Sequence, residues 1–171
     1  MEIGVPRESP GHEHRVGLTP FGVARLKDLG CHVLVQDGAG RDSHFTSEDY
    51  AGAGAVIVYQ AGEVFGRADL VCKIGRPTAA EVRLMRPGAA VAGFMHLAVM
   101  PAETIRAVEE TEATVIGYET RRRRGWWSPR EGSYPSVLHA TEHALTLAPR
   151  GFVPVACRKG WSQSESGRHF S

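Results

Sequence analysis

Short apolar runs alternate with stretches of mixed polarity along the first 120 residues of the chain. The runs are rich in Val, Ile and Ala and have the length of buried strands, whereas the stretches between them place apolar residues at helical spacing. Predicted strands cover residues 2–5, 31–36, 55–58, 68–74, 89–95 and 114–117. Predicted helices cover residues 20–29, a segment from 46 or 47 through 50, a short segment around 63–64, and residues 81–85 and 101–110.

Local signals mark where several of these helices begin and end. Thr19 stands before a proline that suits the first helical turn, and Gly30 can adopt the left-handed conformation of a C-cap. Thr46 or Ser47 is the predicted cap of the second helix, and Thr78 that of the fourth. Strands that alternate with helices predict an α/β fold, in which helices cover both faces of a mostly parallel sheet. We therefore expect a Rossmann-like or flavodoxin-like sandwich.

The regular alternation ends after residue 120, and the charge balance changes at the same point. Residues 1–120 carry 11 Lys and Arg against 16 Asp and Glu, whereas residues 121–171 carry 9 against 3. The second segment is rich in Ser, Arg, Gly and Pro, with one short helix predicted around 139–147. We therefore predict one domain over residues 1–120 and an irregular, poorly ordered basic tail over 121–171. A frameshift or truncation near residue 121 is one hypothesis for this abrupt change.

The composition is typical of a soluble globular protein and not of a membrane protein. A chain of 171 residues with 42% hydrophobic and 23% charged residues has the size and composition of one soluble globular domain. No apolar run approaches the ~20 residues that span a bilayer, and the N-terminus leads directly into a predicted strand. Cys31 and Cys72 fall within predicted strands, and neither they nor Cys157 have metal or redox spacing. We expect a cytoplasmic protein with buried, reduced thiols and no membrane partner.

Three polar residues stand where predicted strands end. Arg15 follows the first strand, Lys73 lies near the end of the fourth, and His96 follows the fifth. Taken singly, each is more typical of a surface ion pair, a solvated lysine or a histidine without catalytic function. The carboxyl ends of parallel strands meet at one edge of a sheet, however, and ligands bind there. An arginine fork binds a carboxylate, a lysine adds charge or polarises a carbonyl, and a histidine transfers protons near neutral pH. Together they suit a small α-keto or α-amino acid.

Seven short segments, together with Phe45, Asp49, Tyr50 and Pro77, lie in order along the first 120 residues: 3–8, 15–20, 37–40, 53–55, 69–73, 94–98 and 117–120. In this order they resemble the N-terminal domain of the alanine dehydrogenase and pyridine-nucleotide transhydrogenase family. The His-Leu-Ala at 96–98 and the Tyr-Glu-Thr at 118–120 favour alanine dehydrogenase over the transhydrogenase α subunit.

The resemblance implies a role for four residues. Arg15 and Lys73 would bind the carboxylate and carbonyl of pyruvate or alanine, and His96 would be the catalytic acid/base group. Phe94 would line the pocket at a position where the family usually has a tyrosine. The phenylalanine removes one hydroxyl, which leaves the substrate preference open.

The resemblance also implies a reaction and a cofactor, namely the NAD-dependent, reversible oxidative deamination of L-alanine to pyruvate and ammonia. In the family a separate domain binds NAD and supplies a catalytic aspartate, and C-terminal helices complete the substrate lobe. This sequence shows no glycine-rich dinucleotide turn, because the glycines at 37–40 and 52–54 are better explained as ordinary turns. No residue is therefore assigned to a cofactor, and stand-alone activity is not expected.

Two functional classes follow for a truncated lobe of this kind. The first is an enzyme lobe with a small-molecule substrate, in a homo-oligomer or with a complementing chain that supplies the NAD domain. The alternative is a non-catalytic remnant, a binding module for a small 2-oxo or amino acid, or a lobe related to the transhydrogenase α subunit.

The tail contains two further patterns. Residues 139–143 match the H-x-x-E-H pattern of a zinc peptidase, and four arginines at 121–124 precede two tryptophans. The first is a short match without a third ligand, and the second is typical of a solvated linker. We therefore expect neither a metal site nor nucleic-acid binding.

Overall fold

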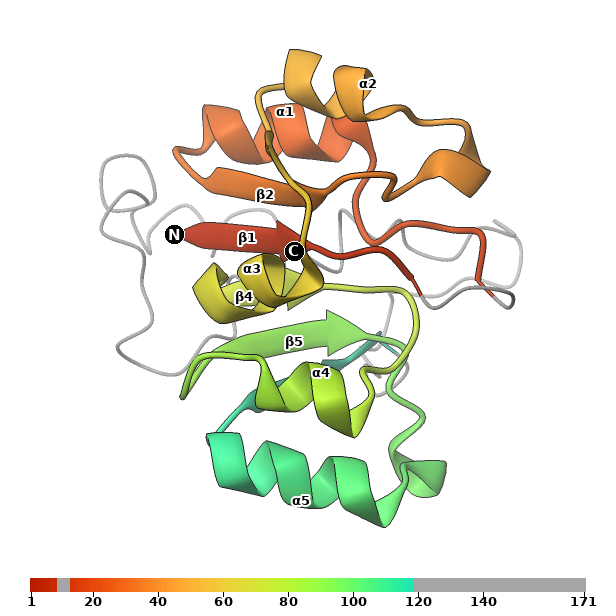
Figure 1. The fold of residues 1–171 in the computed structure, drawn as a ribbon, viewed down its shortest axis with the longest axis vertical. Coiled ribbons are helices and arrows are strands. Elements are labelled where there is room, and N and C mark those ends of the chain that lie inside the picture. The colour runs from red at the N-terminus through yellow and green to blue at the C-terminus, as the bar shows by residue number, and fades with distance from the viewer. Residues whose placement is uncertain (9–12, 119–171) are drawn as a thin grey trace, which may run out of the picture.

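A computed structural model of the chain describes residues 1–8 and 13–118. They form one six-stranded sheet with the strand order β3-β2-β1-β4-β5-β6, and every neighbouring pair is parallel (Figure 1). The strands are β1 (Glu2–Val5), β2 (His32–Gln36), β3 (Val56–Val58), β4 (Leu70–Cys72), β5 (Ala90–Gly93) and β6 (Thr114–Gly117). The predicted α/β fold with a parallel sheet is confirmed, and all six predicted strands are present.

Five α-helices and two short 3-10 turns connect the strands. The helices are α1 (Pro20–Asp28), α2 (Ser47–Gly52), α3 (Ala61–Arg67), α4 (Ala79–Arg83) and α5 (Ala102–Thr111). The 3-10 turns η1 (Arg41–Ser43) and η2 (Leu97–Val99) carry no apolar periodicity, and the sequence did not predict them. The helices themselves begin within three residues of their predicted starts.

Side-chain caps explain where three helices begin. The Thr19 hydroxyl accepts a hydrogen bond from Gly22 N–H at the start of α1. Thr46, rather than Ser47, caps α2, and Thr78 caps α4. Both of these threonines form capping boxes with an acidic residue three positions later, so two backbone N–H groups that lack a helical partner are satisfied at each start.

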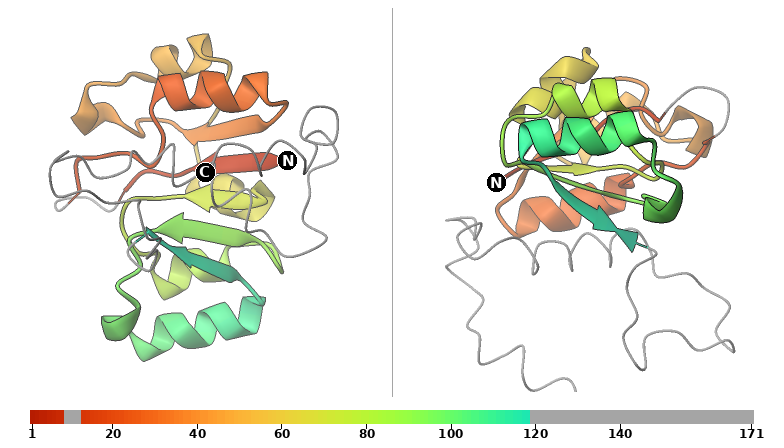
Figure 2. Two further views of the ribbon diagram at one scale, coloured as in Figure 1. Left: turned by 180° about the vertical axis from the view of Figure 1, so that it is seen from behind. Right: turned by 90° about the horizontal axis from the view of Figure 1, so that it is seen from below.

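The helices form two layers, one on each face of the sheet. Figure 2 shows α1 on one side of the strands and α3, α4 and α5 on the other. Val33 and Val35 of β2 belong to the core that contains α1 and α2, whereas Leu34 between them packs against Val64 of α3. This alternation is the period of two that strands impose on their side chains. Cys31 and Cys72 are buried, as predicted.

Two strands are shorter than the apolar runs that predicted them. The runs at 68–74 and 89–95 are buried over nearly their whole length, yet β4 ends at Cys72 and β5 at Gly93. Beyond Cys72, the N–H groups of Ile74 and Gly75 donate to the Glu8 carboxylate instead of a neighbouring strand. The Glu8 carboxylate thus takes these two N–H groups, while Phe94 N–H still donates to Ile74 C=O at 2.8 Å. The predicted tail over 121–171, with its helix around 139–147, lies outside the described residues.

Candidate functional site

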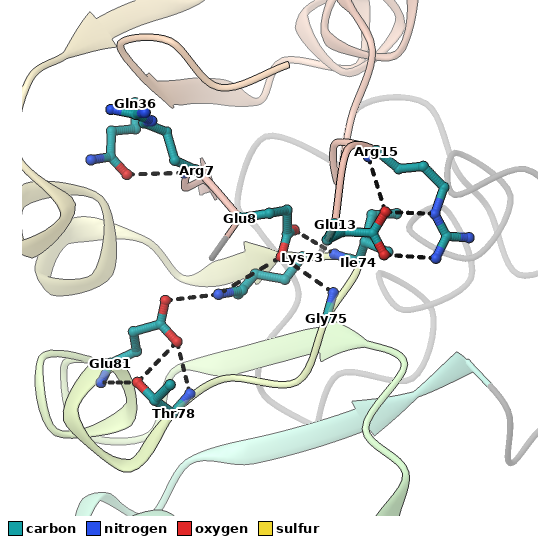
Figure 3. Close-up of polar contacts among 10 residues, drawn as sticks. All are labelled: Arg7, Glu8, Glu13, Arg15, Gln36, Lys73, Ile74, Gly75, Thr78 and Glu81. Atoms are coloured by element: carbon teal, nitrogen blue, oxygen red, sulfur yellow. Dashed lines mark hydrogen bonds and ion pairs between the residues drawn. The ribbon is translucent and has the colours of Figure 1, made fainter. Parts of the chain in front are cut away.

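Arg15 lies in the loop between β1 and α1, at the carboxyl edge of the sheet. Its Nε and Nη2 donate to the two carboxylate oxygens of Glu13, at 2.8 and 2.7 Å (Figure 3). Its guanidinium carbon lies 5.8 Å from the centre of the Phe94 ring, which follows β5. The Arg15 side chain is 65% exposed. The predicted carboxylate-binding arginine therefore presents its fork at the surface, and that fork already holds a carboxylate.

The same pairing shifts the ionisation of both partners. Hydrogen bonds from Arg15 are the main reason that the pKa of Glu13 is lower than its ordinary value. Those hydrogen bonds also raise the pKa of Arg15. Near neutral pH both groups are therefore charged, and the pair is a charge-assisted, bidentate contact.

The loop around Arg15 is held in place on both sides. Gly17 packs so closely against the end of β4 that a Cβ at this position would overlap the Cys72 carbonyl. On the other side, the Ser43 hydroxyl of η1 donates to His14 C=O at 2.6 Å, and His14 Nδ1 lies 3.5 Å from Asp42. The backbone near Arg15 is thus fastened to β4 and to the loop after β2.

Lys73 occupies a buried position directly after β4. The side chain is 1% exposed, and Nζ donates to Glu81 Oε1 at 2.7 Å. The ammonium also lies 3.9 Å from Glu8 Oε2 and 6.0 Å from the centre of the Phe65 ring. Glu81 uses its other oxygen to accept the N–H of Thr78 in the capping box of α4. The buried charge of Lys73 is therefore neutralised by two carboxylates from different parts of the chain.

Glu8 connects this buried pair with the loop that carries Arg15. Its side chain is 5% exposed and accepts the N–H groups of Ile74 at 2.7 Å and Gly75 at 3.3 Å. Burial raises the pKa of Glu8 above its usual value, although these hydrogen bonds and the Lys73 charge act in the opposite direction. The negative charge of Glu13 adds to the rise. Two carboxylates thus lie near each other at the edge of the sheet.

Phe94 and His96 follow β5. The Phe94 ring packs edge-on against Tyr118, with the ring centres 5.4 Å apart, and its other neighbour is the Arg15 guanidinium. His96 is exposed and has a left-handed backbone, with φ at 47°. A residue other than glycine in this region is uncommon and costs conformational energy, and such residues cluster at functional sites.

A shallow hollow lies between the loops after β1 and β2. Its lining includes Glu8, Glu13 and Arg15 from the first loop and Gly40, Arg41 and Asp42 from the second. The structure therefore brings Arg15 into a hollow and into contact with Phe94. Lys73 and His96 are not among the residues that line this hollow; Lys73 adjoins it through Glu8, and His96 lies on the turn beyond Phe94. The guanidinium groups in this lining attract a ligand carboxylate, whereas the carboxylates beside them repel one.

The sequence analysis missed three carboxylates that pair with the predicted site residues Arg15 and Lys73. Glu81 had a signal, because Thr78-x-x-Glu81 has the spacing of a capping box. Glu13 stands two residues before Arg15, so a local pair could have been considered. Glu8 had no such signal for its contact with Lys73, because 65 positions separate the two residues and only the fold brings them together.

The described residues contain no candidate metal cluster, and their glycines at 38 and 40 lie in a turn. No group of three or more His, Cys, Asp or Glu among them is placed to hold a metal ion. Gly38 and Gly40 have left-handed backbones and lead into the three-residue turn η1, so they form the predicted turn and do not open a long helix. In the part of the chain that the structure describes, no helix is long and apolar enough to cross a membrane. The H-x-x-E-H match and the arginine run lie outside that part.

Comparisons with known proteins agree on one family. The family model described as "Alanine dehydrogenase/PNT, N-terminal domain" matches residues 4–126. Alanine dehydrogenase of Mycobacterium tuberculosis (strain ATCC 25618 / H37Rv) is 42% identical over 148 residues, which cover 86% of this chain and 38% of that protein. Alanine dehydrogenase of Bilophila wadsworthia is 43% identical over 120 residues, which cover 70% of this chain and 31% of that protein. The chain thus spans well under half the length of these relatives.

Two solved structures share the fold. An L-alanine dehydrogenase superimposes with a TM-score of 0.65 at 36% identity, over 70% of this chain and 32% of the other. A transhydrogenase from Sinorhizobium meliloti superimposes with a TM-score of 0.68 at 31% identity, over 73% of this chain and 37% of the other.

Proposed function

Because the chain belongs to the alanine dehydrogenase/PNT N-terminal domain family, we propose that it forms the substrate-binding lobe of an alanine dehydrogenase-type oxidoreductase. The observation that carries this proposal is the guanidinium group of Arg15, whose Nε and Nη2 hold a carboxylate beside a hollow at the carboxyl edge of the sheet. The α-carboxylate of pyruvate or alanine has the same shape and charge as the carboxylate of Glu13. It can therefore bind the fork in the same way.

The other site residues receive distinct roles in this proposal. Phe94 packs against Arg15 and limits the space beside the ligand. Lys73 supplies positive charge toward the ligand carbonyl. Because its ammonium is buried, it contacts the ligand directly only if the ligand takes the place of Glu8 beside it. His96 is the proton donor and acceptor at the substrate oxygen, and its exposed position on the turn after β5 gives a ligand access to its ring.

The proposed reaction is the oxidation of L-alanine to pyruvate and ammonia, with NAD as the hydride acceptor. The described residues do not fit NAD, because none of their glycine turns opens a helix that could cradle a pyrophosphate. We therefore assign substrate binding and proton transfer to this chain, and no step of hydride transfer. The proposal requires a dinucleotide site outside the described residues, which a complementing chain can supply, and it is compatible with a homo-oligomer. The cytoplasm is the proposed location.

A second candidate function is a small-acid binding module without turnover. The neutralised state of Lys73 favours it, because an ammonium already paired with Glu81 at 2.7 Å has less to offer a substrate carbonyl. A related alternative is that the chain forms the corresponding lobe of a transhydrogenase-type enzyme, because its fold is also similar to that of a transhydrogenase.

Isothermal titration calorimetry of the purified chain with pyruvate measures binding to the proposed site. We expect binding in the wild type, weaker binding for Arg15→Lys, which loses the fork but keeps the charge, and no measurable binding for Arg15→Ala. Arg25→Ala is the matched control, because Arg25 is exposed on α1 and does not line the hollow. Undiminished binding in Arg15→Ala would refute the proposed site.

An assay of alanine-dependent NADH formation separates the two candidate functions. We expect no NADH from this chain alone, and formation of NADH when a chain with a dinucleotide site is added. Pyruvate binding without activity under both conditions would favour the binding module. Activity without any added chain would contradict the assignment of NAD to a partner.

A further inference from the structure

We propose that Glu13 is a positioning residue for the ligand, which fixes the direction of the Arg15 guanidinium and leaves the edge between Nη1 and Nη2 for the ligand carboxylate. This inference rests on the proposed function and deepens it, because it names the residue that orients the same site. Glu13 accepts from Arg15 Nε at 2.8 Å and from Nη2 at 2.7 Å. A guanidinium has a second edge of parallel N–H donors, on Nη1 and Nη2, and the contact with Glu13 leaves that edge unused.

The second edge of Arg15 is open to a ligand. Figure 3 shows Glu13 along the side of the guanidinium that carries Nε, with the third nitrogen directed away from it. Among the described residues, Nη1 has no hydrogen-bond partner. The Arg15 side chain is 65% exposed, so a dissolved ligand can reach this edge. A carboxylate can therefore bind both Nη groups while Glu13 stays in place.

Several contacts hold Glu13 and Arg15 in a fixed relation to each other. Glu13 Oε1 also accepts the main-chain N–H of Arg15 at 3.0 Å, which closes a short ring of hydrogen bonds within the loop. The backbone between the two residues is held from the loop after β2, where the Ser43 hydroxyl donates to His14 C=O. The Phe94 ring lies beside the same guanidinium, with its centre 5.8 Å from the guanidinium carbon. The long Arg15 side chain is thereby held in one direction before a ligand arrives.

The charge of Glu13 persists near neutral pH. The hydrogen bonds from Arg15 are the main reason that the pKa of Glu13 is lower than its ordinary value. Glu13 therefore remains an acceptor for both Nε and Nη2 under the conditions of a binding experiment.

Two opposite effects decide how Glu13 changes the affinity. Ordering a long, exposed side chain on binding weakens the affinity about five-fold, and this cost disappears when Glu13 orders Arg15 in advance. Against this, Glu13 repels a ligand carboxylate that lies roughly 7 Å away on the other edge of the guanidinium, which in water at physiological salt costs less than about two-fold. Positioning is the larger effect, so Glu13 should tighten binding about three-fold.

Calorimetric titration of the purified chain with pyruvate measures this contribution. We expect Glu13→Ala to bind about three-fold more weakly than the wild type. Glu13→Gln keeps an acceptor oxygen for Nε, so its affinity should lie between the two. Glu63→Ala is the matched control, because Glu63 pairs with Arg67 on α3, outside the residues that line the hollow, and should leave the affinity unchanged. Urea denaturation checks that each variant is folded.

The nitrogen-15 resonances of Arg15 give a readout that a merely structural role would not move. Pyruvate should shift the resonances of Nη1 and Nη2, while Nε stays hydrogen-bonded to Glu13 and its resonance stays away from the position found in Glu13→Ala. Movement of the Nε resonance to that position on pyruvate addition would show that the ligand releases Glu13, and would overturn the inference.

The affinities distinguish the inference from the proposed function. If the wild type bound pyruvate and Glu13→Ala bound it equally well or more tightly, Glu13 would not position the site, and the substrate-binding lobe would stand. Absence of pyruvate binding in the wild type would overturn both.

Discussion

Lys73 shows how a single buried charge constrains this domain. An ammonium that is 1% exposed loses its hydration, and the loss is compensated only by partners at short range. Glu81 provides a hydrogen bond at 2.7 Å, and Glu8 adds a second negative charge at 3.9 Å. The position of Lys73 at a strand end was predictable from the sequence, whereas its contact with Glu8 was not, because the two residues are far apart in the sequence and meet only through the pairing of β1 with β4.

Replacement of Lys73 by methionine tests the contribution of this cluster to stability. Lys73→Met fills a similar volume but leaves Glu8 and Glu81 without their cation, so we expect the free energy of unfolding to fall by about 3 kcal/mol. Urea denaturation followed by circular dichroism measures this change. Arg67→Met is the control, because Arg67 forms exposed pairs and its loss should hardly move the midpoint. Equal stability of Lys73→Met and the wild type would contradict a stabilising role for the cluster.

At the scale of elements, helix starts and strand positions were the most predictable features. Thr46 and Thr78 each have an acidic residue at the spacing of a capping box, and both caps are present. The strand ends were less predictable, because residues 73–74 and 95 are buried although β4 ends at Cys72 and β5 at Gly93. The turns η1 and η2 depend on backbone conformations at Gly40 and His96 that apolar periodicity does not report.

The contact of the Arg15 loop with β4 leads to a prediction at this scale. Gly17→Ala places a methyl group where the Cys72 carbonyl lies, and backbone cannot move aside as a flexible side chain can. We expect a loss of about 2 kcal/mol in the free energy of unfolding, the usual size for overpacking. We also expect weaker pyruvate binding, because the loop that carries Arg15 must shift. Urea denaturation and pyruvate titration measure the two effects.

A second glycine gives the control for this substitution. Gly62 lies in α3, and a Cβ there would meet no atom within 4 Å. Gly62→Ala should therefore be neutral or stabilise the domain by about 0.5 kcal/mol, because alanine favours the helix. Pyruvate binding should be unchanged in this variant. If Gly17→Ala behaved in the same way as Gly62→Ala, the close approach to β4 would not position the loop.

At the scale of the whole molecule, the all-parallel sheet explains why the site is assembled from distant segments. Parallel strands bring the loops after β1, β2, β4 and β5 to one edge, and Glu8, Arg15 and Lys73 of the candidate site come from these loops (Figure 3). This gathering was predictable from the alternation of strands and helices. The ion pairs between the loops were not, because they depend on side-chain directions that the apolar pattern does not encode.

Tyr50 contacts several of these segments within the larger core. Its ionisation makes the free energy of unfolding of the whole domain change with pH in the alkaline range. It is fully buried in α2, its hydroxyl donates to Leu18 C=O at 2.7 Å, and Gly40 packs against its ring. Burial raises the pKa of Tyr50 well above its ordinary value of 10.0. The folded protein therefore keeps a proton that the unfolded chain releases above pH 10. It follows that the contribution of Tyr50 to stability is complete below pH 10 and is lost as the pH rises from there toward the raised pKa.

Tyr50→Phe separates this contribution from the other groups that titrate at high pH. At pH 7 the variant should be less stable by about 1 kcal/mol, because the Leu18 carbonyl loses its donor. Between pH 10 and 11.5 its free energy of unfolding, from urea denaturation, should fall less steeply than that of the wild type, so the two curves converge. Tyr59→Phe removes a hydroxyl from a side chain that is 80% exposed, and its curve should follow the wild type throughout. Parallel curves for Tyr50→Phe and the wild type would show that burial of the neutral tyrosine does not govern alkaline unfolding.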